Sequence, residues 1–199
     1  MIPSQSIADP LAVRRQASRV LRERLGAGRV AYCETTDDEE VVFAVAEDVT
    51  DDVASLLGHH LRLVDLDPDG SKMFRQGTAP AGGVQAEDSF GAERKAAFAA
   101  TCTRAFMLAP VMKSGRLVAC LTADFKVPHH WTPAEIRFLE ETAERTSAAV
   151  ERARAEGASQ SAQLGRFASA ASDVAARPAG PMSGRLVRWR GTPAFLPRR

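Results

Sequence analysis

The residues of this chain that are best suited to chemistry are its histidines, its cysteines and its runs of acidic side chains. The four histidines occur as adjacent pairs at positions 59–60 and 129–130. Neighbours on a strand point to opposite faces, so neither pair alone can hold one metal ion well. The acidic runs at 37–40 and 51–52 also consist of neighbours, which favours solvated turns over a cation site or an acid–base pair. The sequence therefore predicts no metal site.

The three cysteines, Cys33, Cys102 and Cys120, are odd in number and far apart, and two of them fall in predicted strands. This pattern favours buried, reduced thiols over a disulfide framework or a zinc site. The chain also contains no Gly-x4-Gly-Lys-Ser/Thr phosphate loop, no Gly-x-Ser-x-Gly turn and no Cys-x-x-Cys pair. A histidine kinase would need a phospho-acceptor histidine on a dimerising helix and a nucleotide-binding domain, and neither is present. We expect no enzyme activity.

A mixture of strands and helices must position these residues. Two apolar runs, 104–112 and 116–126, flank a turn that contains Gly115, which is typical of a hairpin of buried strands. The simplest architecture is an α+β fold, an antiparallel sheet of five to six strands backed by the terminal helices. The remaining patterns predict a helix at 10–25, strands at 29–35 and 41–47, a short strand at 60–64, a helix at 68–76, a strand at 83–87 and a helix at 91–101.

The last predicted helix spans 132–156. Its start is well defined, because Thr132 can cap it, Pro133 suits its first position and Glu135 can complete a capping box. Along this helix a narrow, partly apolar seam recurs at spacings of three and four. The seam suits a partner helix in a homodimer or the sheet of its own chain. It consists of Ile136, Leu139, Ala143, Thr146, Val150 and Ala153.

An ordered set of segments in this chain is typical of one known domain. The set includes Leu25-Gly-Ala-Gly-Arg-Val-Ala-Tyr-Cys-Glu, Arg104-Ala-Phe-Met-Leu-Ala-Pro-Val-Met and Pro128-His-His-Trp-Thr-Pro-Ala-Glu. Over residues 10–156 it resembles the GAF domain of the type found in bacterial sensor histidine kinases. The chain departs from that family at positions 129–130, where an arginine usually precedes the tryptophan, and at Cys102, which replaces what is often a small apolar residue.

The resemblance implies that the first and last helices pack together on one sheet face, while short helices and loops wall a ligand pocket on the other. It implies small-molecule sensing and dimerisation in a bacterial two-component protein, with a kinase or response regulator as partner. The ligand itself is not identified by the sequence. Candidate pocket residues combine apolar walls with few polar groups; they are Tyr32, Arg62, Phe74, Arg75, Asp88, Phe98 and Arg104.

Alternative functions remain open beside the sensor interpretation. Some GAF domains carry a bilin on a cysteine that is followed by histidine, and Cys102 lies in the corresponding region, but Thr103 follows it. Core packing of the Cys102 thiol is therefore favoured over covalent bilin attachment or redox sensing. A degenerate, truncated fragment without a ligand is the third interpretation.

Charge divides the chain near residue 156. Residues 157–199 hold seven arginines and one acidic residue, a charge of +6, so residues 1–156 carry −5 of the total of +1. This tail is predicted to be basic and largely disordered, and residues 164–174 resemble the start of a PAS domain. Sparse aromatic residues and the lack of a recognition helix argue against nucleic acid binding. No apolar run is long enough to cross a membrane, so a cytoplasmic location is expected.

Overall fold

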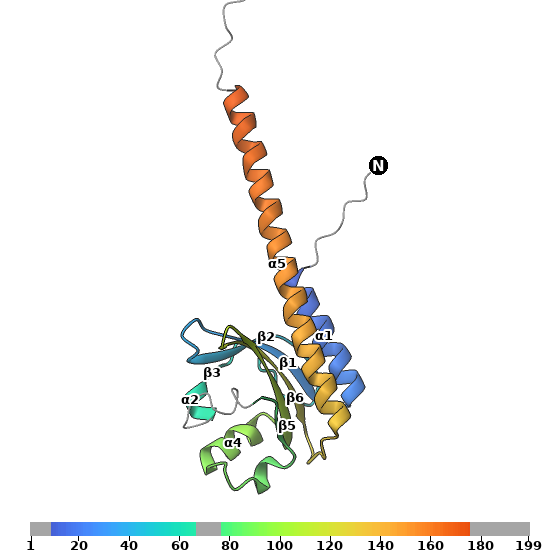
Figure 1. Cartoon of the computed structure of the whole chain (residues 1–199). Helices are drawn as coiled ribbons and strands as arrows, with labels where there is room; N and C mark the ends of the chain where they lie inside the picture. The colour runs from blue at the N-terminus through green and yellow to red at the C-terminus, as the bar shows by residue number, and fades with distance from the viewer. Residues whose placement is uncertain (1–8, 67–76, 176–199) are drawn as a thin grey trace, which may run out of the picture. The chain divides into compact units, whose positions relative to one another are not determined.

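The computed structural model describes residues 9–66 and 77–175, in which helices cover both faces of one antiparallel sheet (Figure 1). This confirms the predicted α+β fold. The chain divides into two units, Met1–Ala158 and Ser159–Arg199, and the packing described below lies within the first. The strand order is β3-β2-β1-β6-β5-β4, with β1 at Arg29–Thr35, β2 at Val41–Val49, β3 at His60–Arg62, β4 at Ala79–Ala81, β5 at Ala105–Lys113 and β6 at Arg116–Phe125.

The helices divide between the two faces as predicted. The terminal helices α1 (Pro10–Leu25) and α5 (Pro133–Ala175) cover one face, where Leu21 and Leu139 join the core that the sheet forms there (Figure 1). The opposite face carries α2 (Leu63–Leu66), the 3-10 turn η1 (Val84–Ala86) and α4 (Ala92–Ala100). Buried residues of the first two and partly buried Phe98 of α4 join a second core there.

Local capping explains why the terminal helices begin where they do. The Asp9 side chain accepts a hydrogen bond from the Leu11 backbone N–H at 3.0 Å, so α1 begins at residue 10 as predicted. At α5 the Glu135 carboxylate accepts from the Thr132 N–H at 2.8 Å, and the Glu135 N–H donates to Thr132 Oγ1 at 3.3 Å. This is the predicted capping box.

The last helix is longer than the sequence indicated. Helix α5 ends at Ala175, whereas the pattern predicted an end at 156 followed by a disordered tail. The composition of 157–175 misled because its alanines favour a helix even without an apolar stripe. The side chains of residues 158–166 are exposed, so this part of α5 gains little from packing.

The apolar seam of α5 lies against its own chain. Leu139, Ala143, Thr146 and Val150 are at most 5% exposed and Ile136 is half-buried. Leu139 and Ala143 belong to the core between the terminal helices and the sheet. These buried side chains are therefore not open to a partner helix. The structure shows that the seam packs against the sheet of its own chain.

A close backbone approach at Gly82 lies where the strand assignment has its main error. The segment predicted as a strand at 83–87 forms the 3-10 turn η1 instead. The strand of this region is β4, which ends at Ala81 and pairs with β5. At Gly82 the backbone passes so close to the next loop that an added Cβ would lie 2.8 Å from the His129 carbonyl oxygen. The Gly82 carbonyl accepts a hydrogen bond from the His129 N–H at 2.9 Å, and beyond it Val84 is buried in the core.

The other boundaries differ little from those predicted. The expected strand at 60–64 splits into β3 and the short helix α2, and the helix predicted at 68–76 falls on residues 67–76, outside the described part. Pro110 was predicted to mark a bulge or an edge. Strand β4 pairs with β5 only as far as Leu108, so Pro110 lies where β5 has become an edge, and a bulge follows at Val111.

We expect Gly82→Ala to destabilise the domain by about 1–3 kcal/mol, because the new Cβ would meet backbone that cannot rotate away. Gly91→Ala is the matched control, since a Cβ there meets nothing within 4 Å. Urea unfolding followed by circular dichroism measures both. Equal midpoints for the two variants would show that the approach of residues 82 and 129 is not a constraint.

Candidate functional site

The sheet face beneath α4 is lined by aromatic side chains. The rings of Phe98 and Phe106 stack with centroids 5.0 Å apart, and Phe90 stacks on both at 5.8 and 6.2 Å. The Arg94 guanidinium lies 3.9 Å from the centre of the Phe90 ring. These contacts seat α4 on strand β5, so a small molecule that entered between helix and strand would have to repack this aromatic cluster.

Two thiols lie beside the aromatic cluster on this face. Cys33 of β1 and Cys120 of β6 are direct partners in the antiparallel register, and both are buried. A hydrogen bond to Cys120 and burial raise the pKa of the Cys33 thiol well above its ordinary value. The Cys33 thiol is therefore held in its neutral form. Both thiols of this pair are buried, as expected.

Of the predicted pocket residues that the structure describes, only Phe98 packs against the buried side chains of this face, and it is itself partly buried. Tyr32 is 2% exposed but belongs to the core beneath the terminal helices, with the Arg14 guanidinium 5.5 Å from its ring centre. Its assignment to the pocket is wrong, because successive strand residues alternate between faces and it is Ala31 and Cys33 that point to the α4 side.

The predicted polar residues are not brought together. Arg62 is exposed on the edge strand β3, Asp88 is exposed after η1, and the Arg104 side chain is exposed before β5. Arg104 contributes through its backbone, whose N–H donates to the Phe125 carbonyl at 2.7 Å while its carbonyl accepts from the Val84 N–H at 2.8 Å. Phe74 and Arg75 lie outside the described residues. Cys102, placed among core side chains by the sequence, is exposed instead.

The residues that sequence reasoning missed on this face are mainly Phe90, Phe106 and Leu63. The position of Phe106 could have been found, because side chains alternate between the two faces along strand 105–113. Phe106 is the neighbour of Met107, which lies in the other core, and so points to the α4 face. Phe90 and Leu63 lie at the ends of short segments with no period of their own. Only the fold brings them to the sheet.

A buried ion pair supports the loop that carries Cys102. Arg29 Nε lies 2.8 Å and its terminal nitrogen 2.5 Å from Asp124 Oδ2, and both side chains are almost fully buried. The remaining guanidinium donors reach the Ala54 carbonyl at 2.6 Å and Thr103 Oγ1 at 3.1 Å. Burial raises the pKa of the Asp124 carboxyl, and the Arg29 charge opposes that shift. The pair fixes Thr103 directly beside Cys102.

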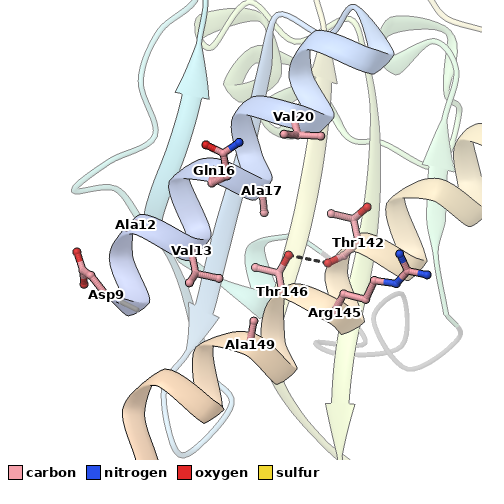
Figure 2. Close-up of a pocket in the computed structure, with 10 residues that line it drawn as sticks. All are labelled: Asp9, Ala12, Val13, Gln16, Ala17, Val20, Thr142, Arg145, Thr146 and Ala149. Carbon is pink, nitrogen blue, oxygen red and sulfur yellow. Dashed lines mark hydrogen bonds between the residues drawn. The ribbon is translucent and has the colours of Figure 1, made fainter. Parts of the chain in front are cut away.

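An open apolar groove runs between the two terminal helices (Figure 2). Its volume is about 510 Å³, and its walls are mostly small side chains. On the α5 side, the hydroxyl of Thr146 is already used within the helix, because its Oγ1 donates a hydrogen bond to the Thr142 carbonyl at 2.6 Å (Figure 2). The lining residues are Asp9, Ala12, Val13, Gln16, Ala17, Val20, Thr142, Arg145, Thr146 and Ala149.

Among residues 9–66 and 77–175, no group of three or more His, Cys, Asp or Glu side chains is arranged to hold a metal ion. Within the same ranges, no helix combines the length and the apolar character that a membrane span requires.

A two-faced antiparallel sheet, with terminal helices on one side and short helices on the other, defines a small α+β domain. The chain belongs to the GAF family, because the model described as GAF domain matches residues 9–150. The GAF domain of PixJ from Thermosynechococcus elongatus, in its blue-light absorbing form, is 19% identical, with a TM-score of 0.67 over 81% of this chain and 96% of that one. A phycocyanobilin-bound GAF domain from a cyanobacterial phytochrome is 14% identical, with a TM-score of 0.65 over 75% and 88%.

At these identities the solved structures establish the fold alone. No curated protein sequence matches the chain.

We expect Asp124→Ala to destabilise the domain by about 3–5 kcal/mol, because it leaves the buried Arg29 charge without its partner. The double variant Arg29→Met/Asp124→Leu removes both charges and should recover at least half of that loss. Glu141→Gln, which breaks an exposed pair with Arg145, should cost at most about 0.5 kcal/mol. Chemical unfolding measures all three, and a double variant less stable than Asp124→Ala would contradict the ion-pair argument.

Proposed function

We propose that this chain is the small-molecule-sensing and dimerisation module of a bacterial two-component signalling protein, and that it is not itself an enzyme. The observation that carries the proposal is the pairing of α1 and α5 on one face of a GAF sheet whose other face is lined by the Phe90, Phe98 and Phe106 rings. A kinase or response regulator is the proposed downstream partner, and the cytoplasm the proposed location.

The groove between α1 and α5 supports dimerisation, whereas the apolar seam of α5 is buried within its own chain. The outer surfaces of Ala17, Val20 and Ala149 leave apolar area uncovered between the helices. Helix α1 carries five arginines and one glutamate, whereas residues 133–156 of α5 carry six glutamates and four arginines. In a two-fold dimer, α1 of one copy lies on α5 of the other, so opposite charges flank the apolar contact.

Signalling would then be a bias between two packings of the terminal helices. A ligand that enters beneath α4 and repacks the aromatic cluster would favour one packing over the other. The shift cannot exceed the difference between its affinities for the two states. No catalytic group is needed for this mechanism.

A second candidate is a bilin photoreceptor that uses Cys102. It is favoured by the similarity to GAF domains solved with bound bilins and by the exposure of the Cys102 thiol at the end of α4. Against it, Thr103 follows the cysteine and is occupied by its hydrogen bond with Arg29.

The dimer interface can be tested by placing a charge in the groove. We expect the purified chain to be a dimer in native mass spectrometry, and Ala149→Glu to weaken the dimer at least tenfold, about 1.4 kcal/mol. Ala148→Glu is the matched control, because Ala148 is exposed on the same helix outside the groove. Val150→Glu would not serve, since Val150 is 2% exposed and the variant would disturb the core. A wild-type monomer, or equal effects of the two variants, would refute this interface.

The photoreceptor alternative is tested by producing the chain in cells that also make biliverdin or phycocyanobilin. If it is correct, the protein acquires a visible absorbance band, and Cys102→Ser loses it. A discrete extra mass without absorbance favours the sensor of a colourless molecule. Neither band nor extra mass would favour the interpretation as a fragment without ligand.

A further inference from the structure

Helix α5 makes its last contacts with the sheet through charged groups. Between residues 133 and 166 of α5, Ala153 is the last buried residue, and residues 154–166 are exposed apart from half-buried Gly157. At this level the two carboxylate oxygens of Glu34 on strand β1 lie 2.8 and 3.0 Å from the Arg154 guanidinium. Close to it, Glu151 of α5 forms an ion pair with Lys113 of strand β5.

The same carboxylate also holds the first helix. Arg14 of α1 forms an ion pair with Glu34, so one side chain of the sheet joins both terminal helices. The two arms differ in burial, because the Arg14 side chain is 8% exposed and that of Arg154 is 55% exposed. An exposed ion pair is weak and easily exchanged for water, whereas a buried charge is strongly held. Arg154 is therefore the arm that can be released.

The interface around Glu34 is polar and incompletely paired. Among the described residues, Arg14 Nε and Ser18 Oγ are buried without a hydrogen-bond partner. Beside them the Tyr32 hydroxyl bonds with Ser147 of α5, and burial raises the Tyr32 pKa. Unsatisfied buried polar atoms cost free energy. The packing of the helices on this part of the sheet therefore carries a free-energy cost at Arg14 and Ser18.

Strand β1 connects this polar interface to the opposite face of the sheet. Cys33, the neighbour of Glu34, lies in the core beneath α4 together with Ala31, Phe98 and Phe106. Successive side chains of a strand point to opposite faces, so a displacement of β1 caused beneath α4 moves Tyr32 and Glu34 with it.

We propose that Glu34 is a two-armed latch that holds α5 at its point of exit from the domain, and that repacking of the α4 face opens the Arg154 arm while Arg14 stays bound. This inference rests on the proposed sensory function and adds the residue pair through which the signal leaves. It assigns Glu34 and Arg154 a regulatory role rather than a ligand-binding one.

The latch is tested in the full chain by hydrogen exchange of α5 amides measured by mass spectrometry. Arg154→Ala should speed exchange over residues 147–166 by about two- to fivefold, the range expected for loss of an exposed ion pair, with the strands 105–125 unchanged. Glu34→Gln also removes the partner of the buried Arg14 and should have the larger effect. Arg154→Lys, which keeps the charge, should restore most of the protection. Arg152→Ala is the control, because Arg152 is exposed and forms no ion pair with another described residue. Equal exchange in Arg154→Ala and Arg152→Ala would overturn the latch.

Coupling to the other face is tested by a double-mutant cycle with Phe98→Leu. If that substitution opens the Arg154 arm, the double variant Phe98→Leu/Arg154→Ala exchanges no faster than Arg154→Ala alone. If the increases in exchange rate of the two single variants multiply in the double variant, the two faces act independently, and the proposed coupling of the α4 face to the Arg154 arm is wrong. Because exchange needs neither ligand nor dimer, failure of the latch is distinguished from failure of the sensory proposal, which native mass spectrometry decides.

Discussion

Coverage of strand β1 on both faces and both edges is the constraint on which the rest of the domain depends. It pairs with β2 on one edge and with β6 on the other, and its first five residues are all buried. A strand in this position must divide its side chains between two cores that differ in chemistry. Val30 and Tyr32 meet the terminal helices, whereas Ala31 and Cys33 meet the short helices and the aromatic cluster. Each contact of β1 on the α4 side is therefore one residue away from a contact with the terminal helices. The buried Arg29–Asp124 pair lies at the start of this strand.

Features that depend on neighbours in sequence were predictable. Asp9, Thr132 and Glu135 each cap a backbone group within three residues, so the sequence alone located the starts of α1 and α5. The hairpin of β5 and β6 was equally clear, because its two apolar runs are separated by a tight turn. The family resemblance then supplied the arrangement of layers that these local signals leave open.

Features that depend on pairing across the sheet were not predictable. Tyr32 was assigned to the wrong face, since the face of a strand residue follows from its register and a bulge between Tyr32 and Cys33 interrupts the register with β2. Asp124 lies 95 residues from Arg29, and nothing local to either residue indicates the pair. The seam of α5 had the right period, but a period shows only that a stripe is buried and not which surface buries it.

The terminal helices run in opposite directions. The Arg24 guanidinium near the end of α1 lies 5.1 Å from the Phe138 ring near the start of α5, whereas Arg14 and Arg154 share Glu34 at the other end. The polypeptide thus enters and leaves the folded unit at the same end. Because its two ends lie close together, a module with this geometry can be inserted by gene fusion into a surface loop of another protein without forcing the two sides of that loop apart.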